Sequence, residues 1–207
     1  MKTCAPRLFR RSIVLAAAGI LAVLLTACTG SGGGFLPPGP TASDTFPETV
    51  FTGKASFGFN FSCEDKGGLN PPTGQLAIEL SYVERSTGVL TTPFGIHGVA
   101  DVIDPVLESA ICIGQNPPPG GNELIFLGTY RTTSAAPSFF PKACTKSTSL
   151  CRFEVIVRDN DNNLAPSPGD FFQISLSSAT TVGSTLPVGT VFYTRAGLLS
   201  AGNLTVR

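Results

Sequence analysis

The chain has 207 residues, of which 14 are basic and 14 acidic, and only 14% of its residues are charged. Four of the basic residues and none of the acidic ones precede residue 28, so the rest of the chain carries 10 basic and 14 acidic side chains. This balance excludes the basic face that binding to nucleic acid or to an anionic membrane surface would need.

Residues 1–27 have the pattern of a bacterial lipoprotein signal peptide. A basic segment from Lys2 to Arg11 precedes an apolar run over 13–27, and this run ends directly before Cys28. Small residues before the cut suit a signal peptidase, and the Cys28 thiol is the nucleophile that takes a thioether-linked lipid, with palmitate among its acyl chains. The sequence predicts a protein of the cell envelope, lipid-anchored outside the cytoplasm at the outer membrane, on its periplasmic side or at the cell surface.

An uncleaved transmembrane helix and simple secretion are the alternatives for this leader. Its apolar run of about 15 residues is shorter than the roughly 20 that cross a bilayer, which favours cleavage and lipidation. Arg10 and Arg11 also fit a twin-arginine export signal loosely, although adjacent arginines are ordinary in a basic leader.

Residues 28–50 are predicted to form a lipidated flexible tether. Gly-Ser-Gly-Gly-Gly over 30–34 is flexible, and Pro-Pro-Gly-Pro over 37–40 is stiffer and extended. This composition lacks the apolar side chains that build a core. Residues 51–207 remain as one domain of ordinary size.

From residue 51 onward the sequence has the pattern of short strands. Phe57, Phe59 and Phe61 alternate with small or polar residues, which indicates a half-buried strand. The predicted strands cover 54–61, 75–83, 95–103, 107–113, 123–132, 152–159, 170–176, 188–194 and 198–206, with turn residues between them. We therefore predict an all-β fold, an antiparallel β-sandwich or partly closed barrel of about eight or nine short strands.

Four cysteines remain in the domain, an even number in an oxidising compartment, and three pairings are possible. The short separation of Cys144 and Cys151 favours a bridge between them, which leaves Cys63 with Cys112. A zinc site is the alternative, but no CxxC pair is present.

Residues 135–151 form the least regular stretch and contain Phe139 and Phe140. Long loops of this kind are either functional or packed onto the core as a flap. The two rings are interpreted as anchors of the loop, with a ligand surface as the alternative.

Segments Gly53–Phe59, Thr73–Leu76, Phe153–Asn160, Gly169–Leu176 and Gly197–Val206 combine alternating apolar residues with glycine in a defined order. Together they resemble the post-COAP domain, a small all-β module found beside choice-of-anchor proteins. The resemblance implies an extracellular β-domain and supplies no catalytic residues. The four cysteines and the stretch 135–151 depart from the pattern of that family.

Asp159, Asp161 and Asn163 have the i, i+2, i+4 spacing of a calcium loop, and Asp170 falls at the twelfth position. Oxygen ligands at alternate positions curl around one cation. Leu164 stands where such a loop has glycine, and a final aspartate is shorter than the usual glutamate. A simple turn between strands is therefore the alternative to a calcium site.

The sequence offers little support for catalysis. His97 is the single histidine, and neither G-x-S-x-G nor S-x-x-K occurs. Our hypothesis is a non-enzymatic, membrane-anchored lipoprotein that displays its β-domain through Cys28 to bind a protein or glycan partner or to serve the envelope structurally. The alternatives are a calcium-stabilised or carbohydrate-binding module and, third, a secreted hydrolase.

Overall fold

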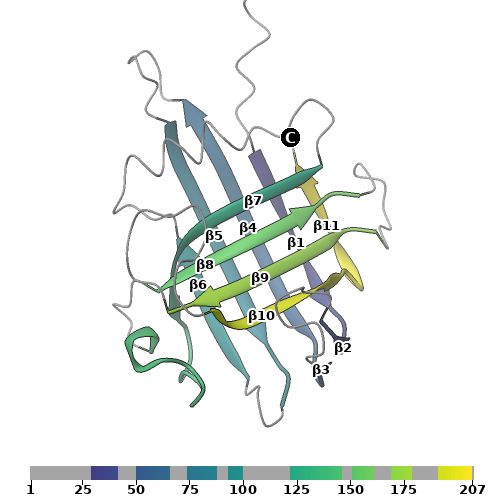
Figure 1. Cartoon of the computed structure of the whole chain (residues 1–207). Helices are drawn as coiled ribbons and strands as arrows, with labels where there is room; N and C mark the ends of the chain where they lie inside the picture. The colour runs from purple at the N-terminus through teal and green to yellow at the C-terminus, as the bar shows by residue number, and fades with distance from the viewer. Residues whose placement is uncertain are drawn as a thin grey trace, which may run out of the picture.

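The computed structural model describes residues 29–41, 50–65, 74–87, 93–99, 122–145, 151–160, 169–178 and 191–206. These residues build a nine-stranded antiparallel sheet with the order β10-β9-β8-β7-β6-β5-β4-β1-β11 (Figure 1). Its strands are β1 (Thr29–Leu36), β4 (Ala55–Asp65), β5 (Gly74–Glu84), β6 (Phe94–Val99), β7 (Glu123–Thr132), β8 (Arg152–Arg158), β9 (Phe171–Ser177), β10 (Val191–Leu198) and β11 (Ala201–Val206). The other elements are β2 (Gly39–Pro40), β3 (Val50–Phe51) and one 3-10 turn, η1 (Lys142–Cys144). Among these described segments, no helix has the length and apolar character needed to span a membrane.

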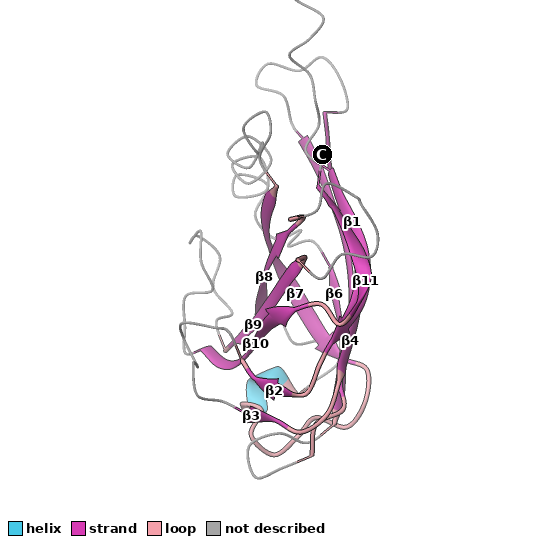
Figure 2. Cartoon of the chain, turned by 90° about the vertical axis from the view of Figure 1, so that its right-hand side faces the viewer, coloured by secondary structure: helices cyan, strands magenta, loops and turns pink. Residues whose placement is uncertain are grey.

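The sheet folds over on itself into two layers that form a half-barrel. β11, β1, β4 and β5 make one layer, and β7, β8, β9 and β10 cross it, with β6 at the turn between them (Figure 1 and Figure 2). β10 and β11 are the two edges of the sheet, so the half-barrel stays open between them in the described chain. This confirms the prediction of an all-β sandwich or partly closed barrel.

Aromatic side chains fill the space between the two layers. Alternation along β4 points Phe57, Phe59 and Phe61 inward, as predicted, and all three are buried. The Phe57 ring stacks on Phe172 of β9 with 3.6 Å between centroids, and Phe59 lies 5.3 Å from Phe126 of β7. Each fully buried ring of this kind stabilises the fold by about 1.5–3 kcal/mol.

The prediction of a flexible tether over 28–50 is wrong for the part of that stretch that forms β1. Its glycine-rich part forms β1, which lies inside the sheet between β4 and β11, with Gly30 opposite both Phe61 and Val206. A Cβ placed on Gly32 would lie 2.6 Å from the carbonyl oxygen of Asn203, so this position has no room for a side chain. Glycine serves here to let neighbouring chains approach closely.

The stretch 135–151, which follows β7, is held against the core where the structure describes it. This agrees with the interpretation of Phe139 and Phe140 as anchors. The Cys144 and Cys151 sulfurs are bonded, with the two Cα atoms 5.5 Å apart. The Phe140 ring is buried and lies 5.0 Å from the ring of Phe94. Cys112 and the side chain of Cys63 lie outside the described residues, and so does the predicted strand 107–113. The Cys63–Cys112 bridge therefore stays a prediction.

Candidate functional site

The outer face of the sheet over the neighbouring strands β6, β5, β4 and β1 carries mainly small and polar residues. Residues directly opposite each other on adjacent antiparallel strands point to the same side, so the ladder register defines rows across this face. One row is Gly33, Gly58, Ser81 and His97, and the next is Ser31, Asn60, Glu79 and Val99.

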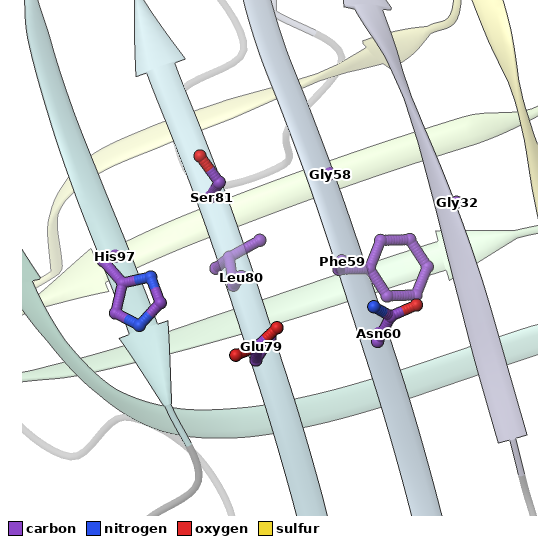
Figure 3. Close-up of a pocket in the computed structure, with 8 residues that line it drawn as sticks. All are labelled: Gly32, Gly58, Phe59, Asn60, Glu79, Leu80, Ser81 and His97. Carbon is purple, nitrogen blue, oxygen red and sulfur yellow. The ribbon is translucent and has the colours of Figure 1, made fainter.

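A shallow hollow of about 340 Å³ opens to solvent on this face (Figure 3). Gly58 forms part of its floor, and a Cβ added there would find only a backbone oxygen, at 3.9 Å, within contact range. The side chains around it come from three neighbouring strands: Asn60 on β4, Glu79 and Ser81 on β5, and His97 on β6. Asn60, Glu79 and Ser81 are exposed, and His97 is half-buried.

The rim of the hollow mixes hydrogen-bond donors with acceptors. Glu79 accepts only when ionised, whereas the Asn60 amide, the Ser81 hydroxyl and a neutral His97 imidazole each both donate and accept. Within the described residues the structure records no hydrogen bond among these four side chains, so their polar groups are open to a ligand. A hydroxyl-rich ligand matches such a rim, because each hydroxyl also donates and accepts.

The hollow brings together a serine, a histidine and a carboxylate, the residue types of a hydrolytic triad. Ser81 lies directly opposite His97 in the ladder, and Glu79 is two residues from Ser81. A working triad needs hydrogen bonds from serine to histidine and from histidine to the acid. Neither bond occurs among the described residues, and the Ser81 hydroxyl is turned away from the imidazole (Figure 3).

An oxyanion hole is also missing from the described surroundings of Ser81. Such a hole needs free N–H groups aimed at one developing negative charge. Around Ser81, β5 is paired with β4 on one side and β6 on the other, so its backbone N–H groups belong to the sheet ladders. Ser81 therefore lies on the rim of the hollow, on a strand whose N–H groups are paired on both sides.

A second polar cluster is buried inside the half-barrel, at the end of β1 that leads to β2. Arg195 on β10 forms an ion pair with Glu84 on β5, with 3.1 Å between the Nη1 and Oε2 atoms, and both side chains are at most 2% exposed. The Arg195 Nη2 atom donates to the carbonyl oxygens of Pro37 and Gly53 at 2.7 and 3.0 Å. The guanidinium also lies over the Phe51 ring, 4.0 Å from its centroid.

The remaining lone pairs of Glu84 also have partners. Its Oε1 accepts hydrogen bonds from the backbone N–H groups of Arg85 and Ser86 at 2.9 and 2.7 Å. The hydroxyl groups of Tyr82 and Tyr193 lie 3.1 and 2.8 Å from Oε2, and burial, together with the charge of Glu84, raises the pKa of both tyrosines well above the usual value. The pair and its hydrogen bonds therefore connect β5 in one layer with β10 in the other.

Two of the four predicted calcium ligands are described, and both support the edge strand β11. The Asp170 carboxylate accepts from the N–H groups of Asn160 and Leu204 at 3.1 and 2.9 Å, and Asp159 Oδ2 accepts from Val206 N–H at 3.3 Å. These carboxylates thus satisfy N–H groups at an edge of the sheet. Asp161 and Asn163 lie outside the described residues, and no group of three metal-binding side chains occurs among the residues described. The calcium site stays a prediction.

Glu154 on β8 carries a pH-dependent penalty for folding. Its side chain is only 8% exposed, and burial raises its pKa above the usual value. The pKa of Glu154 is higher in the folded than in the unfolded state, so ionisation of Glu154 lowers the free energy of unfolding. This loss is absent at pH values below both pKa values. It grows as the pH rises between them and is complete above the folded pKa. We expect Glu154→Gln to raise the free energy of unfolding at pH 8 and to leave it nearly unchanged at pH 4.

Urea denaturation at the two pH values measures this effect. Glu123→Gln is the matched control, because Glu123 is exposed and pairs with Arg158 at the surface. An equal change for Glu154→Gln at pH 4 and pH 8 would contradict the prediction.

The fold and the hollow define an all-β, two-layer domain with a polar site that is open to solvent. Comparison of the chain with protein-family models, with curated proteins and with solved structures gives no match. The resemblance to the post-COAP domain stays a prediction.

Proposed function

We propose that this protein is a non-enzymatic lipoprotein of the bacterial cell envelope whose β-domain binds a hydroxyl-rich ligand, an envelope glycan, in the hollow over Gly58. The observation that carries the proposal is the combination of an open glycine floor with a rim of donors and acceptors on three adjacent strands. Ligand sites are concave and use a few convergent polar groups to orient the ligand. The hollow has that character, although it is shallow.

The sequence supports the anchored part of the proposal. The basic leader, its short apolar run and Cys28 fit a lipoprotein signal, and Cys28 itself lies outside the described residues. The domain that follows carries more acidic than basic residues, so its membrane association is assigned to the lipid.

The non-enzymatic part rests on the geometry around His97. Among the described residues the Ser81–His97 and His97–Glu79 hydrogen bonds of a triad are not formed, although the three residues line one hollow. A fluorophosphonate probe, which reacts with activated serines, is expected to leave Ser81 unmodified. Labelling of Ser81 that is lost in His97→Ala would instead support the secreted hydrolase.

Gly58→Val is expected to weaken ligand binding and to stabilise the domain. A Cβ at this position meets only a backbone oxygen, at 3.9 Å, so the valine has room to project into the hollow. A β-branched residue also suits a strand better than glycine by about 0.5–1 kcal/mol. Binding is measured for the lipid-free domain on an array of purified envelope polysaccharides, followed by calorimetry with a fragment that binds. We expect at least a tenfold loss of affinity together with a higher melting temperature.

Ser62→Val is the control, because Ser62 lies four residues beyond Gly58 on the same face of β4 and does not line the hollow. This variant is expected to keep wild-type affinity. Equal affinity of Gly58→Val and the wild type would contradict the assignment of the hollow as the binding site. An absence of binding to any glycan at millimolar concentration would show that the ligand of the hollow is not an envelope glycan.

A further inference from the structure

Phe35 on β1 is the one exposed phenylalanine among the residues that the structure describes. Its side chain is 43% exposed, whereas the phenylalanines of the core are at most 7% exposed and the remaining described ones are half-buried. A ring left in water does not give the hydrophobic stabilisation that a buried ring gives. Single exposed apolar residues are common on protein surfaces, so the location of this ring is what matters.

Phe35 lies on the same face of the sheet as the hollow, directly beside it. The next residue, Leu36, is buried, so alternation along β1 points Phe35 outward. Phe35 lies opposite Ser56 of β4, which is two residues from Gly58 in the floor of the hollow. Diagonal neighbours of this kind are about 7–8 Å apart. Gly33, which lies opposite Gly58, places no side chain between the ring and that floor.

The row of residues that contains Phe35 gives the hollow an apolar edge. Val83 of β5 also lies opposite Ser56, so it is in the same row as Phe35, and it is half-buried on the outer face. The small Ser56 lies between the two apolar side chains. The other side of the hollow is polar, with Asn60 and Glu79 opposite each other. An apolar edge facing a polar edge suits a ligand that has both kinds of surface.

We infer that the ligand of the hollow is a β-linked oligosaccharide whose pyranose rings carry equatorial substituents, and that one of these rings stacks on Phe35. The inference rests on the proposed function of the hollow. Such a sugar presents C–H groups on its faces and hydroxyl groups around its edge, so a face covers an aromatic ring while the edge reaches donors and acceptors. An axial hydroxyl would project from the face and lose its water without gaining a partner on the ring.

The spacing of the residues requires more than one sugar unit. Phe35 and Ser81 are two strands and one row apart. With strands about 4.8 Å apart and about 3.3 Å per residue along each strand, their Cα atoms are separated by roughly 12 Å. This exceeds the length of one pyranose ring, so the sugar on Phe35 and the sugar at Ser81 are different units of one chain. Arg85, whose Nη1 atom donates to the Ser56 hydroxyl at 3.0 Å, places a guanidinium beside that chain.

Calorimetry of the lipid-free mature chain with a tetramer of β-1,4-linked N-acetylglucosamine tests the inference. Phe35→Ala is expected to weaken binding about fivefold or more, because truncation of an aromatic contact at a binding site has an effect of this size. Phe35→Tyr, which keeps the ring, is expected to keep the wild-type affinity. A tetramer of α-1,6-linked mannose carries an axial hydroxyl on each ring and is expected to bind more weakly to the wild type.

Phe35→Trp adds a spectroscopic test, because the chain has no tryptophan of its own. The emission of this variant is expected to shift to shorter wavelength when the N-acetylglucosamine tetramer covers the indole ring. Val50→Trp is the matched control, because Val50 is 65% exposed and belongs to the separate two-stranded sheet of β2 and β3. Its emission is expected to stay constant.

The outcomes separate this inference from the proposed function. Wild-type affinity of Phe35→Ala, or unchanged emission of Phe35→Trp at a saturating concentration of the tetramer, would overturn the stacking and leave the hollow as the site. Equal or tighter binding of the mannose tetramer would overturn the ligand class, and so would binding of another glycan alone that is lost in Gly58→Val. If no glycan binds, the inference and the proposed function are both wrong.

Discussion

Arg195→Met is expected to lower the free energy of unfolding by about 3–5 kcal/mol. The substitution leaves Glu84 charged and fully buried without its cation, and it removes the donor to the carbonyl oxygens of Pro37 and Gly53. Burial of an uncompensated carboxylate and of unpaired carbonyl groups accounts for the size of the loss. Guanidinium denaturation at pH 7 measures it directly.

Two variants control this experiment. Arg158→Met removes the exposed partner of Glu123 and is expected to cost at most about 1 kcal/mol, because water screens surface pairs. The double variant Arg195→Met with Glu84→Gln is expected to recover part of the loss, because no unpaired charge remains buried. A loss below about 1 kcal/mol for Arg195→Met alone would show that the ion pair does not hold the two layers together.

The double variant Gly32→Val with Gly34→Val is expected to prevent stable folding, with a loss of at least about 3 kcal/mol. A Cβ on Gly32 would lie 2.6 Å from the Asn203 oxygen, and one on Gly34 would lie 2.6 Å from the Ala201 oxygen. Both clashes are with the backbone of β11, which cannot move aside as a side chain would. Circular dichroism and thermal unfolding of the domain beginning at Thr29 measure the result.

Ser31→Val in the same strand is the matched control. Ser31 is exposed on the outer face of β1, so a valine there should fold with stability close to that of the wild type. If the double glycine variant were as stable as this control, residues 30–34 would act as the flexible spacer that their composition predicted, and β1 would not be part of the folded sheet.

The strand β1 shows why local composition led to the wrong prediction of a flexible tether. A run of glycines has no apolar side chains, and the same property suits a flexible linker and a strand packed against crowded neighbours. What distinguishes the two is the surroundings, here Asn203 and Leu204 of β11, which lie far away in the sequence. The alternation of Phe57, Phe59 and Phe61 carried no such ambiguity, because a period of two along the chain directly defines an inner face.

The hollow could be predicted only in part. Alternation places Asn60, Glu79 and Ser81 on the side of their strands away from the core, whereas the strand with His97 has no clean alternation. Their meeting depends on which strands are neighbours and on the register between them, and a shift of one residue would turn a whole strand over. The buried pair of Arg195 and Glu84 could not be predicted from the sequence at all. The two residues are 111 positions apart, and nothing in the neighbouring sequence marks either as a core residue.

The sequence by itself determined the all-β class and the inner aromatic faces, and it favoured the short-range Cys144–Cys151 bridge among three possible pairings. These features depend on neighbours a few residues apart, and so a linear pattern contains them. The tertiary structure alone decided that 29–36 is an inner strand, that four rim side chains share one hollow, and that Arg195 and Glu84 form a buried pair between the two layers. Each of these depends on contacts between distant segments, which form only when the sheet assembles in one register.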